Sequence, residues 1–193
     1  MSITCTNRED LEKFMIKHLK PSRYEHSLGV EKMATELAEI HGADVEKAAF
    51  AGRYHDIAKC FDIDDINHYI IKYNIDRKYM DNIALAHSKV AAAILEHDYG
   101  VTDEDVLNAV KSHTTGRVGM SLLEEIVYVS DAIEDNRDYP ELKELQALAR
   151  VNLDEACLFI MNFAVLMILE KGRELDEETL DAREYIKERL KVK

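Results

Sequence analysis

The chain has 193 residues, of which 47% are hydrophobic, and it contains only seven glycines and two prolines. This length and composition predict one compact domain over residues 1–193, because no glycine-, proline- or serine-rich stretch forms a linker. The formal net charge of -13 repels a phosphate backbone, so nucleic-acid binding is not expected.

The sequence also bears on the cellular environment. The longest apolar run, residues 156–169, is shorter than the roughly 18 residues that a membrane span requires. The N-terminus lacks the basic flank, apolar stretch and cleavage site of a secretory signal, so a cytoplasmic location is expected. Three scattered cysteines without a C-x-x-C motif are typical of reduced thiols. The sequence leaves a homodimer open.

The spacing of apolar residues predicts helices along nearly the whole chain. Thr6 and Glu9 form a candidate capping box for a first helix that Pro21 closes. A second helix is predicted over about 22–41, and Asp44 caps a third that runs through Lys59. Short helical pieces cover 62–84, and further helices are predicted at 87–98, 103–113, 120–135, 141–171 and 177–191. No alternating or β-branched run indicates a strand, so the sequence predicts an all-α, single-domain helical bundle.

Four of the eight histidines and two aspartates lie in apolar surroundings. They are His26, His55, Asp56, His87, His113 and Asp131. A buried carboxylate or imidazole needs a partner, and a metal ion satisfies several such groups at once. The sequence therefore predicts a metal centre if the bundle brings these helices together. The other four histidines lie beside polar residues or at helix ends, where exposure or capping explains them.

The order of these six residues resembles that of the HD superfamily of metal-dependent phosphohydrolases, which are all-helical. The segments RYEHSLGV, YHDIAK, KSHTTGRVGMSLLEEIVYVSDAIEDNR and LARVNLDEA extend the likeness, over about residues 8–172, to the YqeK family. Members of that family split symmetrical dinucleoside tetraphosphates such as diadenosine tetraphosphate. Asp135 departs from the family pattern, which more often has proline there, and Ser88 follows His87 where the family usually has glycine.

The resemblance implies a centre with two divalent transition-metal ions. One ion is held by His26, His55, Asp56 and Asp131, and the other by Asp56, His87 and His113. Neighbouring residues on a helix point about 100° apart, so His55 faces one ion while the catalytic carboxylate of Asp56 bridges toward the second. Two ions about 3.5 to 4 Å apart activate a hydroxide for attack on a phosphoryl group. These ligand types suit several metals, of which iron or manganese is expected.

Basic residues near the metal ligands are candidates for binding phosphate. Lys59 lies four residues after His55 and on the same face of the predicted helix, where it neutralises phosphate charge during catalysis. Arg23 and Arg137 have the same expected role. A solvated surface position explains each of these cations about as well.

The segment after the last metal histidine is a further candidate for substrate contact. Thr114, Thr115 and Gly116 can present hydroxyl and backbone N–H groups to phosphate, although an ordinary helix-ending turn uses the same residue types. The C-terminal helix at about 177–191 is expected to be an amphipathic, solvated helix without a catalytic role.

Three functions stay open from the sequence alone. The first is symmetrical hydrolysis of dinucleoside tetraphosphates, which the HTTG and D-x-I-E segments favour. The second is an HD-type nucleotidase or cyclic-dinucleotide phosphodiesterase. The third is a nucleotide-binding HD regulator without activity, or a di-iron oxidoreductase of ferritin-like type. The complete set of six ligands argues against a regulator, and no histidine has the glutamate three residues earlier that ferritin-like sites require.

Overall fold

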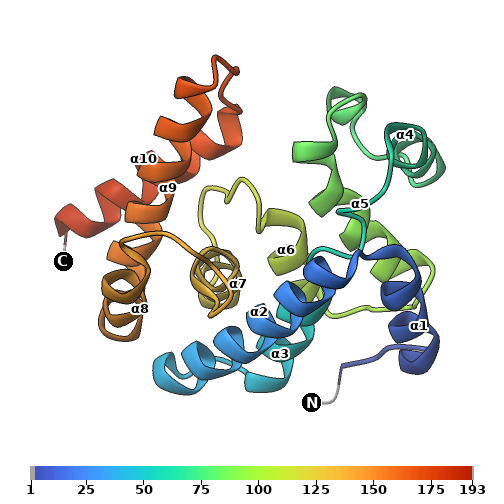
Figure 1. Cartoon of the computed structure of the whole chain (residues 1–193), viewed down its shortest axis with the longest axis horizontal. Helices are drawn as coiled ribbons and strands as arrows, with labels where there is room; N and C mark the ends of the chain where they lie inside the picture. Colours follow the sequence, from blue (N-terminus) through green and yellow to red (C-terminus); the bar gives the residue numbers. More distant parts are fainter. Residues whose placement is uncertain (1–2, 193) are drawn as a thin grey trace.

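The structure is a computed structural model that describes residues 3–192. These residues form ten α-helices and one short 3-10 helix, and no strand lies among them (Figure 1). The elements are α1 (Arg8–His18), α2 (Pro21–His41), α3 (Val45–Tyr54), α4 (Ile63–Lys72), η1 (Arg77–Tyr79), α5 (Ile83–His97), α6 (Glu104–Ser112), α7 (Leu122–Ile133), α8 (Leu142–Val151), α9 (Leu153–Glu170) and α10 (Glu177–Val192). The prediction of an all-α fold is confirmed.

Helix α7 lies at the centre of the bundle, with α2, α3 and α6 packed around it (Figure 1). Helices α8, α9 and α10 cover one end, while α1, α4 and α5 cover the other. Fully buried side chains fill the space between these layers, including Leu37 of α2, Ile126 of α7 and Ile57 in the segment after α3. The metal-ligand candidates from distant parts of the chain therefore meet in the middle of the bundle.

Two glycines allow α2 to approach its neighbours closely. A Cβ added at Gly52 of α3 would lie 3.0 Å from the backbone oxygen of Val30 on α2. A Cβ added at Gly29 of α2 would clash with the carboxylate of Glu134, just beyond α7. A larger side chain at Gly52 requires α2 and α3 to move apart, and one at Gly29 requires the Glu134 side chain to move. The hydrogen at Gly52 thus permits the close packing of α2 on α3, and the hydrogen at Gly29 leaves room for Glu134.

Polar side chains cap most helix starts, though not always as predicted. Asp44 accepts a hydrogen bond from the backbone of Lys47, which confirms the predicted start of α3. The first helix is capped by Asn7, which accepts from Asp10, rather than by Thr6, so the predicted capping box is wrong. A true capping box occurs on α7, between Ser121 and Glu124.

Three predicted helices have different bounds in the structure. The helix predicted through Lys59 ends at Tyr54, and turns with i to i+3 bonding follow, such as the bond from the Lys59 N–H to the Asp56 carbonyl. Helix α5 begins at Ile83 rather than at 87. The helix predicted over 141–171 breaks at Asn152, whose extended backbone ends α8 and whose side chain caps α9.

The C-terminal helix is more than the solvated helix that the sequence predicts. Helix α10 packs along α9 and buries Thr179, Ala182 and Ile186. Near its start, Glu178 accepts hydrogen bonds from Tyr79 at 2.6 Å and from the buried Lys89 at 2.9 Å. Burial disfavours the carboxylate, but these partners and Lys78 lower the pKa of Glu178 to about 2. Glu178 therefore ties α10 to α5 and η1.

We predict that Glu178→Gln lowers the free energy of unfolding by roughly 1 to 3 kcal/mol at pH 7, since it removes charge-assisted hydrogen bonds. A carboxylate whose pKa falls from 4.5 in the unfolded chain to about 2 on folding stabilises the protein fully above pH 4.5. That contribution disappears as the pH falls through 4.5 toward 2. The difference between the wild type and Glu178→Gln, measured by urea unfolding, should thus be constant from pH 7 to 5 and narrow below 4.5. The exposed neighbour Glu177 provides the control variant Glu177→Gln, and an equal, pH-independent effect in both variants would contradict the prediction.

Candidate metal centre

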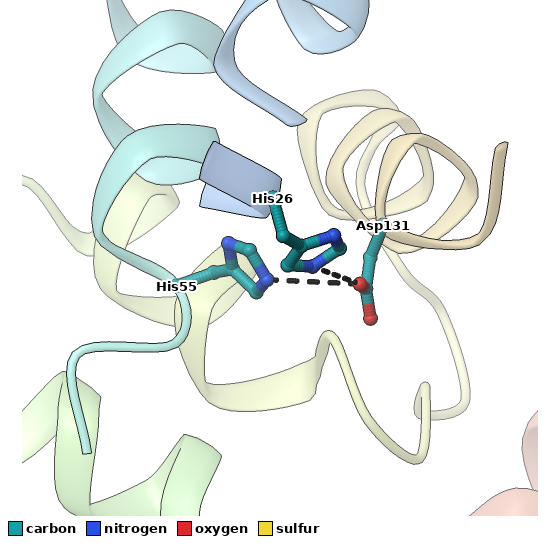
Figure 2. A group of neighbouring side chains, drawn as sticks. All are labelled: His26, His55 and Asp131. Atoms are coloured by element: carbon teal, nitrogen blue, oxygen red, sulfur yellow. Dashed lines mark ion pairs between the residues drawn. The ribbon is translucent and has the colours of Figure 1, made fainter. Parts of the chain in front are cut away.

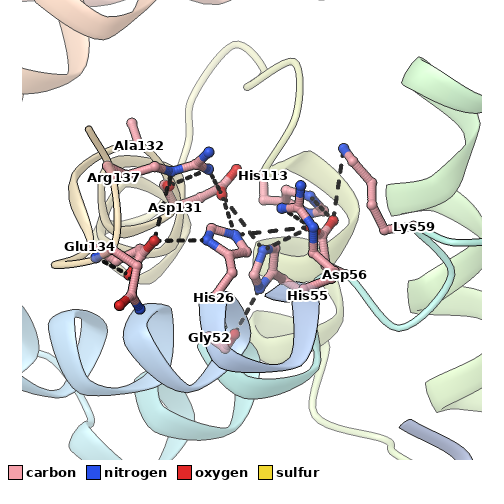
Figure 3. Close-up of polar contacts among 12 residues, drawn as sticks. His26, Gly52, His55, Asp56, Lys59, His113, Asp131, Ala132, Glu134 and Arg137 are labelled. Carbon is pink, nitrogen blue, oxygen red and sulfur yellow. Dashed lines mark hydrogen bonds and ion pairs between the residues drawn. The ribbon is translucent and has the colours of Figure 1, made fainter. Parts of the chain in front are cut away.

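The six side chains predicted to bind metal converge at one place in the bundle. Figures 2 and 3 show five of them, all except His87. His26 comes from α2, His55 and Asp56 from the turn after α3, His87 from α5, His113 from the residue after α6, and Asp131 from α7. Five of the six are buried, and Asp131 retains 24% of its side-chain exposure. The structure thus brings together residues up to about a hundred positions apart in the sequence.

Two of the histidines are oriented by the helix that ends just before them. The Nδ1 of His55 donates to the carbonyl of Gly52 at 2.7 Å, and the Nδ1 of His113 donates to that of Val110 at 2.7 Å. Carbonyls in the last turn of a helix have no intrahelical partner, so each imidazole satisfies one of them. With the proton held on Nδ1, the lone pair of Nε2 faces the centre of the cluster.

The other two histidines are held in the same tautomer by different partners. The Nδ1 of His87 donates to the carbonyl of Ile83 within α5, at 3.0 Å. The Nδ1 of His26 donates at 3.1 Å to Oε1 of Glu134, which is 1% exposed. In metal sites, a hydrogen bond from the outer ring nitrogen to an oxygen fixes the orientation and tautomer of a histidine and makes it a stronger ligand. All four imidazoles therefore present Nε2 inward.

The carboxylate of Asp56 lies at the centre of these nitrogens. Its Oδ1 lies 3.2 Å from Nε2 of His87 and 3.3 Å from Nε2 of His113. Its Oδ2 lies 3.5 Å from Nε2 of His55 and 4.0 Å from Nε2 of His26. The two oxygens thus face two different pairs of imidazoles.

Asp131 faces one of those pairs from the other side. Its Oδ1 lies 2.9 Å from Nε2 of His26 and 3.7 Å from Nε2 of His55 (Figure 2). The ligand atoms of His26, His55 and Asp131 all lie within 4.8 Å of one another, as do those of His55, Asp56 and His113. Residues 3–192 therefore contain two overlapping sets of three metal-ligand atoms.

The hydrogen bonding of the cluster is incomplete without a cation. His26 Nε2, His55 Nε2 and Asp56 Oδ1 are buried and have no hydrogen-bond partner among the described residues. Because the outer nitrogens carry the protons, the inner nitrogens and carboxylate oxygens are all acceptors that face one another. Buried polar atoms of this kind need a partner. Imidazole nitrogens and carboxylate oxygens are the donors of divalent transition-metal sites, so the residues fit such an ion.

The pKa values show the same demand for positive charge. Burial disfavours protonation of His55, yet the carboxylates of Asp56 and Asp131 raise its pKa to about 10. Burial also opposes ionisation of Asp56, but the surrounding imidazoles hold its pKa well below the usual range. His113, by contrast, has its pKa lowered to about 4 by burial. The carboxylates of the cluster therefore favour positive charge beside His55, which a bound metal ion would supply.

Three cations lie beside the cluster and are only partly buried, and Figure 3 labels two of them, Lys59 and Arg137. Arg23 Nη1 lies 3.0 Å from Oδ2 of Asp56, and Arg137 Nη2 lies 2.7 Å from Oδ1 of Asp131. Lys59 Nζ lies 3.0 Å from Nε2 of His87 and 3.9 Å from Oδ1 of Asp56. The position of Lys59 arises from the turn after Tyr54, and not from the helical face assumed in the sequence analysis.

The loop after α6 contributes one of its three predicted residues to the cluster. Thr114 Oγ1 lies 3.1 Å from Nε2 of His87. Thr115 is buried and directs its hydroxyl to the carbonyl of Gly116 and to Glu178. Gly116 has φ of 68° and packs so closely that an added Cβ would lie 2.7 Å from Met161. Thr115 and Gly116 therefore have packing partners, and their predicted contact with substrate has no support from this geometry.

Glu134 is the residue near the centre that the sequence analysis did not identify. It lies directly after α7, and besides binding His26 it accepts hydrogen bonds from the backbone N–H and the side chain of Asn136. The D-x-I-E segment contains it, three residues after Asp131. Its role depends on the reversal of the chain after Ile133, which the helical periodicity does not reveal.

Two cavities adjoin the cluster. One has a volume of about 350 Å³ and is lined by His113, Asp131, Lys59 and a largely apolar wall from α8 and α9. The other has a volume of about 370 Å³ and is lined by polar residues around His26, including Arg23 and Asn136. Arg137 lines both cavities. The cluster thus borders an apolar and a polar space.

Comparison with known proteins gives three findings. The HD domain family model matches residues 23–136, more than half of the chain. The symmetrical bis(5'-nucleosyl)-tetraphosphatases of Bacillus subtilis and Halalkalibacterium halodurans are 36% and 34% identical to the chain, and each alignment covers 90% of this chain and 94% of the relative. The crystal structure of a predicted HD superfamily hydrolase involved in NAD metabolism, from Clostridium acetobutylicum, superposes with a TM-score of 0.89 at 35% identity. That superposition covers 95% of this chain and 98% of the other.

Nothing in the helices suggests a membrane segment. Within residues 3–192, each helix is either too short or too polar to span a bilayer.

We predict that Glu134→Gln weakens divalent-metal binding about 10- to 100-fold, because the acceptor that fixes His26 loses its charge. Metal content after dialysis against graded chelator, measured by elemental analysis, checks this. The exposed Glu141 provides the control variant Glu141→Gln, which should keep wild-type metal content. Full metal retention by Glu134→Gln would show that Glu134 only stabilises the turn after α7.

Proposed function

The chain belongs to the HD domain family, and on this premise we propose that it hydrolyses dinucleoside tetraphosphates symmetrically, converting diadenosine tetraphosphate and water into two ADP. One observation carries the proposal. Relatives that align over 90% of the chain at 34–36% identity are symmetrical bis(5'-nucleosyl)-tetraphosphatases, and in this chain all six predicted metal ligands meet at one buried centre.

The proposed centre contains two divalent transition-metal ions, which we expect to be iron or manganese. His26, His55, Asp131 and Asp56 Oδ2 would hold one, and His87, His113 and Asp56 Oδ1 the other. When bound, such ions polarise a phosphoryl group and lower the pKa of the attacking water. The protein's part is to aim every inner nitrogen at the centre, through the four hydrogen bonds made by the outer nitrogens.

The three partly buried cations provide the charge that a tetraphosphate requires. Arg23, Lys59 and Arg137 lie within 4 Å of the carboxylates of the cluster, with side chains 29–34% exposed. Each can share a hydrogen bond with a phosphate oxygen that enters the site. Since the whole chain carries a net charge of -13, these cations and the metal ions are what makes this region attractive to an anion.

The two cavities support cleavage at the centre of a long substrate. The anhydride to be cleaved lies in the middle of the tetraphosphate, so half of the molecule must extend to each side of the metal ions. The apolar and polar cavities, of about 350 and 370 Å³, both adjoin the cluster and offer space for the two halves. Attack at the central anhydride releases two nucleoside diphosphates, whereas an off-centre attack releases a monophosphate and a triphosphate.

Three expectations about the protein's surroundings remain predictions. They are a cytoplasmic location, no binding to nucleic acid or membrane, and a homodimer as an open assembly state. The first two rest on composition and charge. Free cysteines at positions 5, 60 and 157 are compatible with a reducing compartment.

We predict that the purified, metal-loaded protein converts diadenosine tetraphosphate into ADP as the only nucleotide product, as measured by ion-exchange chromatography of the reaction. Asp56→Ala should form no ADP and lose bound metal while keeping wild-type helical content by circular dichroism, because its two oxygens serve both halves of the cluster. AMP together with ATP would refute symmetrical cleavage. Phosphate release from mononucleotides alone would favour a nucleotidase.

We further predict that Lys59→Met lowers kcat/KM for diadenosine tetraphosphate about 10- to 100-fold, because a charge-assisted contact to phosphate is worth roughly 1.5 to 3 kcal/mol. The substitution keeps much of the aliphatic stem, so the melting temperature and metal content should stay near wild type. The exposed Lys20 provides the control variant Lys20→Met, which should leave kinetics unchanged. A lower melting temperature with unaltered kinetics would assign Lys59 to stability alone.

A further inference from the structure

We propose that the apolar cavity beside the metal centre is a purine-base site, and that the enzyme binds the base of only one of the two nucleosides in its substrate. This inference rests on the proposed function for the reaction. The residues that line the two cavities support the base site.

The apolar cavity is lined both by residues of the metal centre and by aromatic rings. Side chains of His113, Asp131 and Lys59 line it. Tyr139, Phe159 and Phe163 form its aromatic wall. Because one cavity contains both, a nucleotide whose phosphates reach the metal centre can place its base against the aromatic wall. Aromatic side chains bind bases by stacking.

The aromatic wall is built to receive a flat partner. Phe159 is 43% exposed and Phe163 is 49% exposed, although both rings are large and apolar. The rings of Tyr139 and Phe163 lie nearly parallel, at 20°, with centroids 6.5 Å apart. Tyr139 is fixed by the hydrogen bond from its hydroxyl to the carbonyl of Ala132. A base lying on this wall would cover apolar surface that otherwise faces water.

A buried tyrosine in the same cavity offers polar recognition. Tyr128 is 5% exposed and lines the cavity. A tyrosine hydroxyl can donate and accept hydrogen bonds. The edge of a base or a ribose hydroxyl can be its partner.

The second cavity has no comparable wall. Around His26 it is lined by Ser22, Arg23, Asn136 and Arg137, together with the carboxylates of Glu25 and Glu134. No aromatic ring other than the metal-ligand imidazole lines it. Two guanidinium groups suit phosphates, and nothing apolar there holds a second base. The symmetrical substrate is thus read asymmetrically.

This asymmetry implies a further activity toward substrates with one nucleoside. In adenosine 5'-tetraphosphate, the base occupies the aromatic wall and the terminal two phosphates occupy the polar cavity. A water oxygen forms a bond to phosphorus at the central anhydride, the bridging P–O bond breaks, and the products are ADP and pyrophosphate. We expect kcat/KM for this substrate to lie within about tenfold of that for diadenosine tetraphosphate.

A tryptophan probe tests the base site independently of turnover. The chain contains no tryptophan, so Phe163→Trp introduces a single fluorophore into the wall. Titration of the metal-loaded variant with ADP should quench its fluorescence, whereas inorganic pyrophosphate should not. Leu166→Trp is the matched control, because Leu166 lies on the same helix and is 58% exposed outside the cavity, and ADP should leave its emission unchanged.

Kinetics of an alanine variant provide the second test. Phe163→Ala should raise KM for diadenosine tetraphosphate about 5- to 100-fold, the range expected for loss of one base stack, with kcat, metal content and melting temperature near wild type. Leu166→Ala should match the wild type.

Equal effects of the two alanine variants, or no ADP quenching of Phe163→Trp, would overturn the base site. Quenching without hydrolysis of diadenosine tetraphosphate would keep the base site and refute the proposed function. A requirement for both nucleosides, seen as loss of activity on adenosine 5'-tetraphosphate, would overturn one-sided recognition.

Discussion

The architecture depends on the need of one buried carboxylate for positive charge. Asp56 is 1% exposed, and besides Arg23 and Lys59 the nitrogens near its two oxygens belong to four imidazoles. Leaving such a group without a cation inside a helical core would cost several kcal/mol. Arg23 supplies one such contact from the edge, 3.0 Å from Oδ2. A divalent metal ion held by the imidazoles and carboxylates would supply another.

Helix ends, more than helix faces, deliver the ligands. His55 and His113 each follow the last residue of a helix and use its unpaired carbonyls to fix their own protons. Glu134 does the same for His26 from just beyond α7, and the hydrogen of Gly29 leaves room for its carboxylate. Because the same hydrogen bonds end helices and orient ligands, metal affinity and local helix packing are coupled. A larger side chain at Gly29 or Gly52 should therefore disturb both metal affinity and helix packing.

The sequence is sufficient for the fold class and for the six residues that meet at the centre, since apolar surroundings around histidine and aspartate are visible without coordinates. It is insufficient for the local geometry. Alanines and apolar residues continue past Tyr54, so periodicity extended α3 through Lys59, whereas the need to turn both His55 and Asp56 inward ends the helix there. Likewise, Thr115 has the same residue type as Thr114, but its hydroxyl bonds Glu178 and not the cluster. Glu178 lies in a helix more than sixty residues later in the chain. Such long-range competition leaves no mark on local sequence.

The break at Asn152 shows how a local signal serves the site. Leu145 of α8 and Phe159 of α9 line the same cavity of about 350 Å³. In one straight helix, fourteen residues would separate them by about 21 Å, at a rise of 1.5 Å per residue. The extended backbone of Asn152 folds α9 back against α8 and brings both residues to one wall. A polar residue that caps a helix thereby creates the space beside the metal centre, and a continuous helix over 141–171 would have left that centre without its apolar cavity.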